Sequence, residues 1–234
     1  MIASLSRRSL LGAGAALPLL ALGGCAGTLG DLAGLGGFWL EGAIREILTL
    51  SSQRAFNNLL TENGFFEDEL ARVSLPAQFG GSGTATIASA LLRQPFVQNQ
   101  LLRLVNGAAR SAAENAAPLV YDSIRSMTIT DALSIVRGGQ SAATSYLAAS
   151  ICDRIVDAMF PGVGNALRML DSGILTQALG AAAGLNFAGL QQDVTRKAAD
   201  GIWRAIGREE AAIRANPRAT GDPVLIGTFG VLGR

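Results

Sequence analysis

The sequence predicts an all-α protein, a single helical-bundle-like domain that follows a cleaved signal peptide and a glycine-rich tether. Apolar residues recur every three or four positions through most of the chain, as on one face of an α-helix. Alternation with a period of two never persists, which disfavours a sheet. Short stretches rich in Gly, Pro, Asn and Thr separate the periodic segments, as expected where helices end.

Residues 1–24 have the zones of an export signal. Arg7 and Arg8 supply the charged start, and an apolar run from Leu10 to Leu22 follows. This run is shorter than the roughly 20 apolar residues of an ordinary transmembrane helix, so we expect a cleaved signal peptide. The segment around the two arginines also resembles the twin-arginine export motif, and a general secretory signal explains it equally well.

A cysteine follows the apolar run. Leu22, Gly23 and Gly24 precede Cys25, an order that resembles the lipobox of bacterial lipoproteins. The resemblance implies cleavage before Cys25 and acylation of its thiol and its new amine. At about 0.8 kcal/mol per buried CH₂, two or three acyl chains would anchor the protein permanently. The resemblance also implies the periplasmic face of the outer membrane, because Ala26 stands where aspartate would favour inner-membrane retention. The alternative is an ordinary secretory signal with an incidental cysteine.

The mature chain divides into three predicted parts. Residues 25–37 form the lipidated cysteine and a flexible tether, because Ala26 to Gly37 contain five glycines and a single charge. The helical domain is expected at 38–220. The C-terminal tail, 221–234, has no fold that the sequence defines.

Five apolar stripes predict helices within 38–220. They are Leu40 to Leu59, Leu101 to Ala116, Leu147 to Met159, Val163 to Ile174, and Val194 to Ile213. Thr128 and Asp131 fit a capping box, in which each side chain satisfies a free amide at a helix start. The expected breaks are Asn63-Gly64, a loop over 74–83, Gly138-Gly139, a turn at Phe160-Pro161-Gly162, and Asn216-Pro217.

Composition excludes several kinds of chemistry. The chain has no histidine, which removes the Ser-His-Asp and Cys-His arrangements and imidazole metal sites. It has 19 basic and 18 acidic residues, and loss of Arg7 and Arg8 with the leader leaves 17 against 18. Such dispersed, near-neutral charge is unlike that of a nucleic-acid-binding domain. We therefore expect no metal, no cofactor and no nucleic-acid partner.

Several short motifs follow one another along the mature chain. They are Asn63-Gly64-Phe65, Asn106, Ala112-Ala113-Glu114, Ala117-Pro118, Met127 to Leu133, Gly138-Gly139, Ala142-Ala143-Thr144 with Tyr146, Lys197 to Gly201, Glu209-Glu210, Ile213-Arg214 and Asn216-Pro217. Together they resemble a bacterial family known as domain of unknown function 4197. The resemblance covers nearly the whole mature chain and implies an exported, mostly helical domain, without an activity, cofactor or catalytic residue. The chain departs from the family pattern at Ala199 and near Gly221 to Pro223.

One polar cluster has two explanations. Amides at a helix start that follows glycines can hold an anion. Helix capping explains the same residues without any ligand, and we favour it. The cluster comprises Thr128, Thr130, Asp131, Gly138, Gly139, Thr144 and Tyr146.

Three functions remain open. The first is a lipid-anchored binding or structural module, with the membrane and an envelope protein as partners. The second is a histidine-free hydrolase that uses carboxylates such as Glu114 and Asp131. The third is a carrier that encloses an apolar ligand. No convergent catalytic set is visible in the sequence, so we favour a non-enzymatic module. Glu210 and Arg214 are expected to form a helix-stabilising pair on a solvated face.

Overall fold

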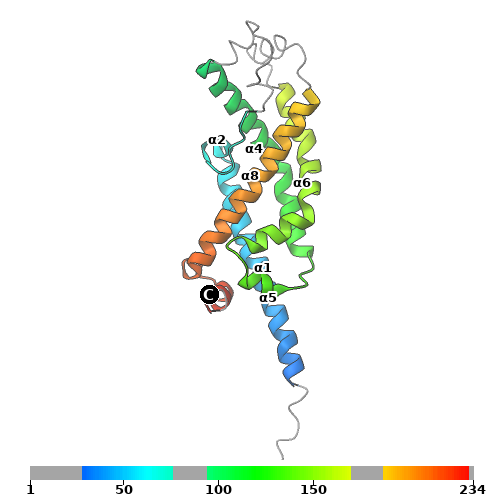
Figure 1. The fold of residues 1–234 in the computed structure, drawn as a ribbon, viewed down its shortest axis with the longest axis vertical. Coiled ribbons are helices and arrows are strands. Elements are labelled where there is room, and N and C mark those ends of the chain that lie inside the picture. Colours follow the sequence, from blue (N-terminus) through cyan, green and yellow to red (C-terminus); the bar gives the residue numbers. More distant parts are fainter. Residues whose placement is uncertain (1–27, 76–93, 170–186, 232–234) are drawn as a thin grey trace, which may run out of the picture. The chain divides into compact units, whose positions relative to one another are not determined.

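A computed structural model describes residues 28–75, 94–169 and 187–231 of the chain (Figure 1). These ranges contain seven α-helices, one 3-10 helix and no strand, so the all-α prediction is confirmed. The elements are α1 (Thr28–Leu59), α2 (Gly64–Glu67), α4 (Pro95–Ser126), α5 (Ala132–Arg137), α6 (Ala142–Met169), α8 (Phe187–Ala215), the 3-10 helix η2 (Pro217–Thr220) and α9 (Pro223–Val231).

The chain divides into two compact units, Met1–Leu35 and Gly36–Arg234. The described part of the first unit is the start of α1, so residues 28–37, which we expected in a flexible tether, are helical. Each glycine in a helix costs about 1 kcal/mol relative to alanine. The leucines and alanines between these glycines are good helix formers, and adding turns to an existing helix is far easier than nucleating one.

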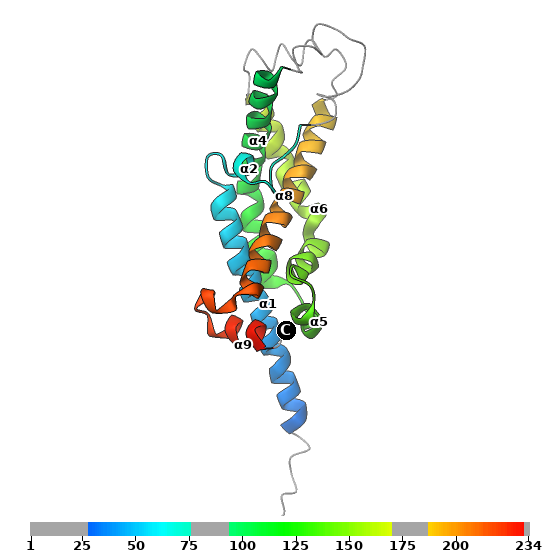
Figure 2. The ribbon, with the colours of Figure 1, turned by 60° about the vertical axis from the view of Figure 1, so that its left-hand side comes forward.

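In the second unit, α1, α4, α6 and α8 follow one another as antiparallel neighbours (Figure 2). Close approaches at two levels show this for α4 and α6. Tyr146, near the start of α6, donates a hydrogen bond to the carbonyl of Thr128, just beyond the end of α4. Further along α6, a Cβ on Gly162 would stand 3.2 Å from Cα of Ala112, in the middle of α4. Packing of α6 against α8 then extends the bundle.

The predicted stripes face one shared core. In α8 the stripe of Val194, Ala198, Ile202 and Ile206 is fully buried. In α4 half of the buried residues are alanines, which allow the neighbouring helices to approach closely. The sequence period therefore predicted both the helices and the faces that they bury.

The turn predicted at Phe160-Pro161-Gly162 is wrong, because α6 continues through it. Pro161 removes one backbone hydrogen bond but leaves φ compatible with a helix. Gly162 lets the α4 backbone pack against this part of α6. The side chain of Gln191, from α8, donates a hydrogen bond to the carbonyl of Phe160 at 2.6 Å. Contacts from two helices thus hold a segment that would end a helix if it were isolated.

The described part of the C-terminal tail, residues 221–231, is folded. After α8 ends at Ala215, η2 and α9 return the chain to the core, where Leu225, Thr228 and Phe229 are buried. The domain therefore continues past the boundary at 220 that the sequence suggested. Among the helices of the described ranges, none combines the length and the apolarity that crossing a bilayer requires.

Candidate functional site

The segment from Met127 to Thr144 links α4 to α6 through the short helix α5, and we call it the junction. It carries the polar cluster that the sequence singled out, apart from Tyr146, which lies in the first turn of α6. Asp131 is the N-cap of α5, and its carboxylate accepts a hydrogen bond from the amide of Ser134 at 3.1 Å. Thr128 contributes its backbone carbonyl, which accepts from Tyr146 Oη at 2.8 Å. The helix thus begins three residues later than the predicted capping box, and Asp131 takes the place expected of Thr128.

Glu210, from α8, caps the start of α6. Its carboxylate accepts hydrogen bonds from the amides of Ala143 at 3.0 Å and Thr144 at 2.7 Å, and from Thr144 Oγ1 at 2.7 Å. The side chain of Glu210 is completely buried, contrary to the expected solvated face. A negative charge at a helix N-terminus is favourable because the helix dipole is positive there. The carboxylate therefore supplies the cap from a helix 66 residues away in sequence.

Arg214 completes this arrangement. Its Nε donates to Glu210 at 2.7 Å, as predicted for a pair four residues apart. Its two terminal nitrogens donate to the carbonyls of Val136 at 2.8 Å and Ile135 at 3.1 Å, at the C-terminal end of α5. The guanidinium also lies 4.6 Å from the centre of the Phe229 ring, in a cation–π contact. One ion pair thus caps the end of α5 and the start of α6 together.

A second arginine caps the end of α4. Arg45, from α1, donates to the carbonyls of Ile124 at 2.8 Å, Arg125 at 3.1 Å and Met127 at 2.6 Å. These are among the last carbonyls of a helix, which have no partner within it. Side chains from α1 and α8 therefore hold three helix ends at the junction.

The two junction glycines play different parts. Gly138 is the C-cap of α5, and a Cβ there would stand 2.7 Å from Cβ of Ala142 and 3.0 Å from the carbonyl oxygen of Ser134. Gly139 has nothing within 4 Å of a would-be Cβ. Only the first glycine is required by close approach. Thr130 is exposed in the segment between α4 and α5.

The first amides of α6 already have acceptors. Glu210 takes those of Ala143 and Thr144, and the amide of Ala142 donates to the carbonyl of Gly139 at 3.1 Å. A free anion at this end would have to compete with a carboxylate that is part of the protein. The geometry of the cluster is therefore that of helix capping.

The two carboxylates considered for hydrolysis lie in separate places. Glu114 is 3.3 Å from Arg110, whose Nε donates to the carbonyl of Leu60 at the C-terminal end of α1. Asp131 lies in the junction, which is held by Arg45. Arg45 and Leu60 are about 22 Å apart along α1, at a rise of 1.5 Å per residue. The two carboxylates cannot act on one bond. Within the described ranges, no three His, Cys, Asp or Glu side chains gather as metal ligands.

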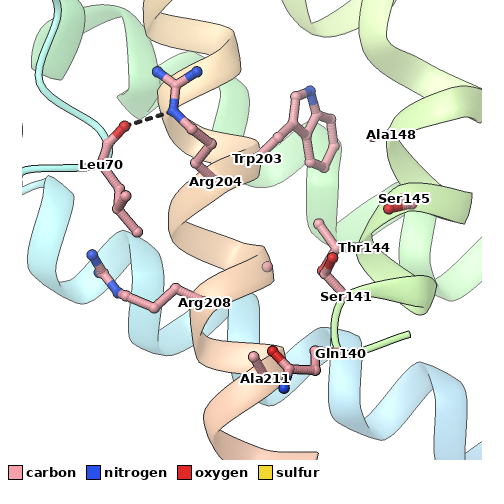
Figure 3. Close-up of a pocket in the computed structure, with 11 residues that line it drawn as sticks. Leu70, Gln140, Ser141, Thr144, Ser145, Ala148, Trp203, Arg204, Arg208 and Ala211 are labelled. Atoms are coloured by element: carbon pink, nitrogen blue, oxygen red, sulfur yellow. Dashed lines mark hydrogen bonds between the residues drawn. The ribbon is translucent and has the colours of Figure 1, made fainter. Parts of the chain in front are cut away.

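Beside the junction, α6 and α8 border an open groove of about 500 Å³, which we call the α6/α8 groove (Figure 3). It is lined by Leu70, Gln140, Ser141, Thr144, Ser145, Ala148, Trp203, Arg204, Gly207, Arg208 and Ala211. Trp203 supplies a large aromatic surface. Ser145 on α6 and Ser141, just before α6, lie opposite it (Figure 3). A concave surface with an aromatic wall and a few polar groups is suited to binding.

The segment that follows α2 forms one wall of the groove. Two arginines of α8 bind this segment. Arg204 Nε donates to the carbonyl of Leu70 at 2.6 Å, drawn as a dashed line in Figure 3. Arg208 forms a two-point ion pair with Asp68, with distances of 2.9 and 2.8 Å. Burial raises the pKa of Asp68, but hydrogen bonds from Arg208 and from the amides of Ala71 and Leu70 outweigh it, so that its pKa lies below the ordinary value. The same pair raises the pKa of Arg208.

Glu210 was misjudged and Arg45 was missed from the sequence. Arg45 has no signal of its own, because its acceptors lie about 80 residues away. Glu210 had one. The α8 stripe continues from Ile202 and Ile206 in steps of four and three to Glu210 and Ile213, so the carboxylate falls on the apolar face. An acidic residue within an apolar stripe indicates a buried partner.

The leader residues lie outside the described ranges. They comprise Arg7, Arg8, Leu22, Gly23, Gly24 and Cys25. The predicted loop residues beyond Leu75 and the stripe beyond Met169 are also outside these ranges. The predictions made for them remain predictions.

Fold and site define a class: an all-α domain whose polar motif residues join helix ends. The chain matches the family described as "Protein of unknown function (DUF4197)" over residues 38–230, and it belongs to that family. Comparison with curated proteins and with solved structures finds no match.

Proposed function

We propose that this protein is a lipoprotein of the bacterial cell envelope, anchored through Cys25 at the periplasmic face of the outer membrane. Its helical domain acts by binding a partner protein and not by catalytic turnover. The lipobox-like order of Leu22, Gly23, Gly24 and Cys25 supports the anchor. The membrane and an envelope protein are the proposed partners.

The observation that carries the non-catalytic proposal is the engagement of Glu210. This carboxylate is the buried acidic group among the family motifs, and both of its oxygens hold structural hydrogen bonds. Asp131 is exposed, and its Oδ1 accepts the capping hydrogen bond from the amide of Ser134 at the start of α5. A catalytic carboxylate needs a free oxygen directed at substrate. Glu210 has no such oxygen, and it stabilises the fold instead.

The α6/α8 groove is the proposed surface for the partner. It presents Trp203 beside the hydroxyls of Ser141 and Ser145, and tryptophan is enriched among residues that dominate binding energy. The apolar-carrier alternative needs an enclosed cavity within the bundle. The close contact of Gly162 with Ala112 leaves little room for one between α4 and α6.

The anchor is tested by Cys25→Ser. We expect loss of acylation and transfer of the protein from the membrane fraction to the soluble periplasmic fraction, because no lipid would then hold it. Mass spectrometry of the N-terminal peptide measures the modification directly. An unmodified Cys25 in the exported native protein, with residues 1–24 still attached, would refute the proposal.

The route of export is a separate question. If the twin-arginine pathway carries the chain, replacement of Arg7 and Arg8 by lysines should leave precursor in the cytoplasm. If the general secretory pathway carries it, export should continue, because lysine preserves the positive start of the signal.

The groove is tested with a photo-crosslinking amino acid at Ala148, which lines it, and at Ala149, the exposed next residue on α6. Consecutive helical positions point about 100° apart, so the second site is a matched control. We expect the position 148 variant to form a discrete adduct with one envelope protein in living cells. Equal adducts from both positions, or none from position 148, would count against the groove.

A further inference from the structure

The beginning of α1 within the second unit and the end of α9 expose large apolar side chains. Phe38 is 75% exposed, Trp39 is 53% exposed and Val231 is 73% exposed. Single exposed apolar residues are common on soluble proteins, but clusters of them often mark binding surfaces. What matters is whether these three belong to one surface.

The contacts of Trp39 join this part of α1 to α9. Its indole Nε1 donates a hydrogen bond to Thr228 Oγ1, on α9, at 3.1 Å. A Cβ on Gly227 would stand 4.0 Å from Cζ2 of the same indole. Val231 follows Gly227 by four residues and therefore lies on the same side of α9. Trp39, Gly227 and Val231 therefore share one surface, and Phe38 is the exposed neighbour of Trp39 on α1. We call these four residues the α1/α9 patch.

The patch is uncharged on both of its helices. No ionisable residue occurs between Asp31 and Glu41, and α9 contains none. The inner face of α9 buries Leu225 and Phe229, and its outer face is apolar as well. A short helix with water on its outer face would ordinarily be polar on that side.

The chemistry of the patch suits the headgroup region of a bilayer. Tryptophan is enriched there because its ring is apolar while its N–H needs a partner. In Trp39 the N–H is satisfied by Thr228 within the protein. The ring can therefore enter the interface without an unpaired donor, and Phe38 and Val231 can enter beside it.

The position of the patch in the chain favours a bilayer over other occupants. Phe38 follows Cys25 by thirteen residues, which span at most about 45 Å when fully extended. A chain anchored at Cys25 therefore keeps the patch within reach of the membrane surface. This step rests on the proposed lipid anchor.

We propose that the α1/α9 patch inserts into the interfacial layer of the anchoring membrane and forms a second, non-covalent contact beside the lipid. The domain is then held in a fixed orientation on the bilayer and does not swing on its anchor. Two such contacts together restrict the domain far more than either does alone.

Trp39 itself reports on this contact. The full mature protein, extracted from its own membrane, is placed in phosphatidylcholine vesicles with or without bromine near the top of the acyl chains. The Trp203→Phe variant leaves Trp39 as the only tryptophan. The difference in emission between the wild type and the Trp39→Phe variant also gives the signal of Trp39, without a change at position 203. We expect brominated lipid to quench Trp39 emission by roughly half or more, as for a ring at the interface.

A charge in the patch provides the matched comparison. Phe38→Asp should reduce the quenching of Trp39 several-fold, because an aspartate resists entry into the bilayer. Phe96→Asp changes the same residue type on α4, where Phe96 is 64% exposed, and should leave the quenching unchanged. Equal effects of the two substitutions, or no quenching in the parent protein, would overturn the inference.

The mass of the Cys25 peptide, measured on the same sample, separates the two proposals. If the protein is lipidated and Trp39 is not quenched, the anchor is supported and the patch contact is refuted. If the protein is not lipidated and added vesicles quench Trp39, the anchor is refuted and the patch contact is supported. A dimer in detergent that Phe38→Asp converts to a monomer would identify a second copy as the occupant and would also overturn the inference.

Discussion

The carboxylate of Glu210 accepts hydrogen bonds from both the amide and the hydroxyl of Thr144, each at 2.7 Å, across 66 residues of sequence. The last long helix thereby supplies the cap that α6 does not provide from its own sequence. Arg214 balances the buried charge and holds the end of α5 at the same time. This network joins acidic and basic motif residues of α8 to the Ala-Ala-Thr motif at the start of α6.

Glu210→Gln should destabilise the domain by about 2–4 kcal/mol, because an amide nitrogen would face donors in a buried site and Arg214 would lose its charged partner. Glu209→Gln is the control. Its side chain is 18% exposed and lies 3.5 Å from Arg208. We expect it to change the free energy of unfolding by at most about 0.5 kcal/mol. Urea unfolding of both variants measures the difference, and similar losses would contradict the capping role.

The junction glycines form a second matched pair. Gly138→Ala would place a methyl group 2.7 Å from Cβ of Ala142, so we expect a loss of about 1–3 kcal/mol as the two helices move apart. Gly139→Ala meets nothing within 4 Å and should be neutral or stabilising by up to about 1 kcal/mol. Thermal unfolding ranks the two variants. The reverse order would show that the close approach at Gly138 does not constrain the junction.

Asp68 should make stability depend on pH. Its pKa is lowered in the folded protein, so its charged form is favoured over that in the unfolded chain, where the pKa is about 3.9. The resulting stabilisation is present above that value and is lost as the pH falls through the folded pKa. Asp68→Asn removes it. The free energies of unfolding of wild type and variant should differ at neutral pH and converge below about pH 4. A difference that grows in acid would contradict the assignment.

Arg45 should contribute to stability through the carbonyls of α4 and not through its ion pair. Arg45→Gln loses three donated hydrogen bonds at the C-terminal end of that helix, and we expect a cost of about 1–3 kcal/mol. Glu41→Gln removes only a contact of 3.8 Å between partly exposed groups. Its effect should stay below about 0.5 kcal/mol. Equal losses, measured by urea unfolding, would assign the stabilisation to the ion pair.

Much of the fold could be predicted from the sequence. The stripes on α1, α4, α6 and α8 follow the helical period, and Gly138 and Asn216-Pro217 end helices where expected. The break predicted at Phe160-Pro161-Gly162 was wrong. Proline and glycine indicate a turn only where local preferences determine the backbone conformation. In α6, contacts with α4 and with Gln191 outweigh them.

The site was less predictable. The capping role of Asp131 could be predicted from the local sequence, because the amide that it binds is only three residues away. The role of Glu210 needed a second helix, although its place on the apolar stripe of α8 already indicated burial. Arg45 could not have been identified at all, since its acceptors are backbone carbonyls that any sequence would provide.

By itself, the sequence determined the all-α class, the buried faces of the helices and the family, because these depend on periods and short motifs within single segments. The tertiary structure alone decided which charges cap which helix ends, and that the junction residues stabilise the fold. Capping between helices depends on distances between segments that lie far apart in the chain. Those distances exist only once the core has packed.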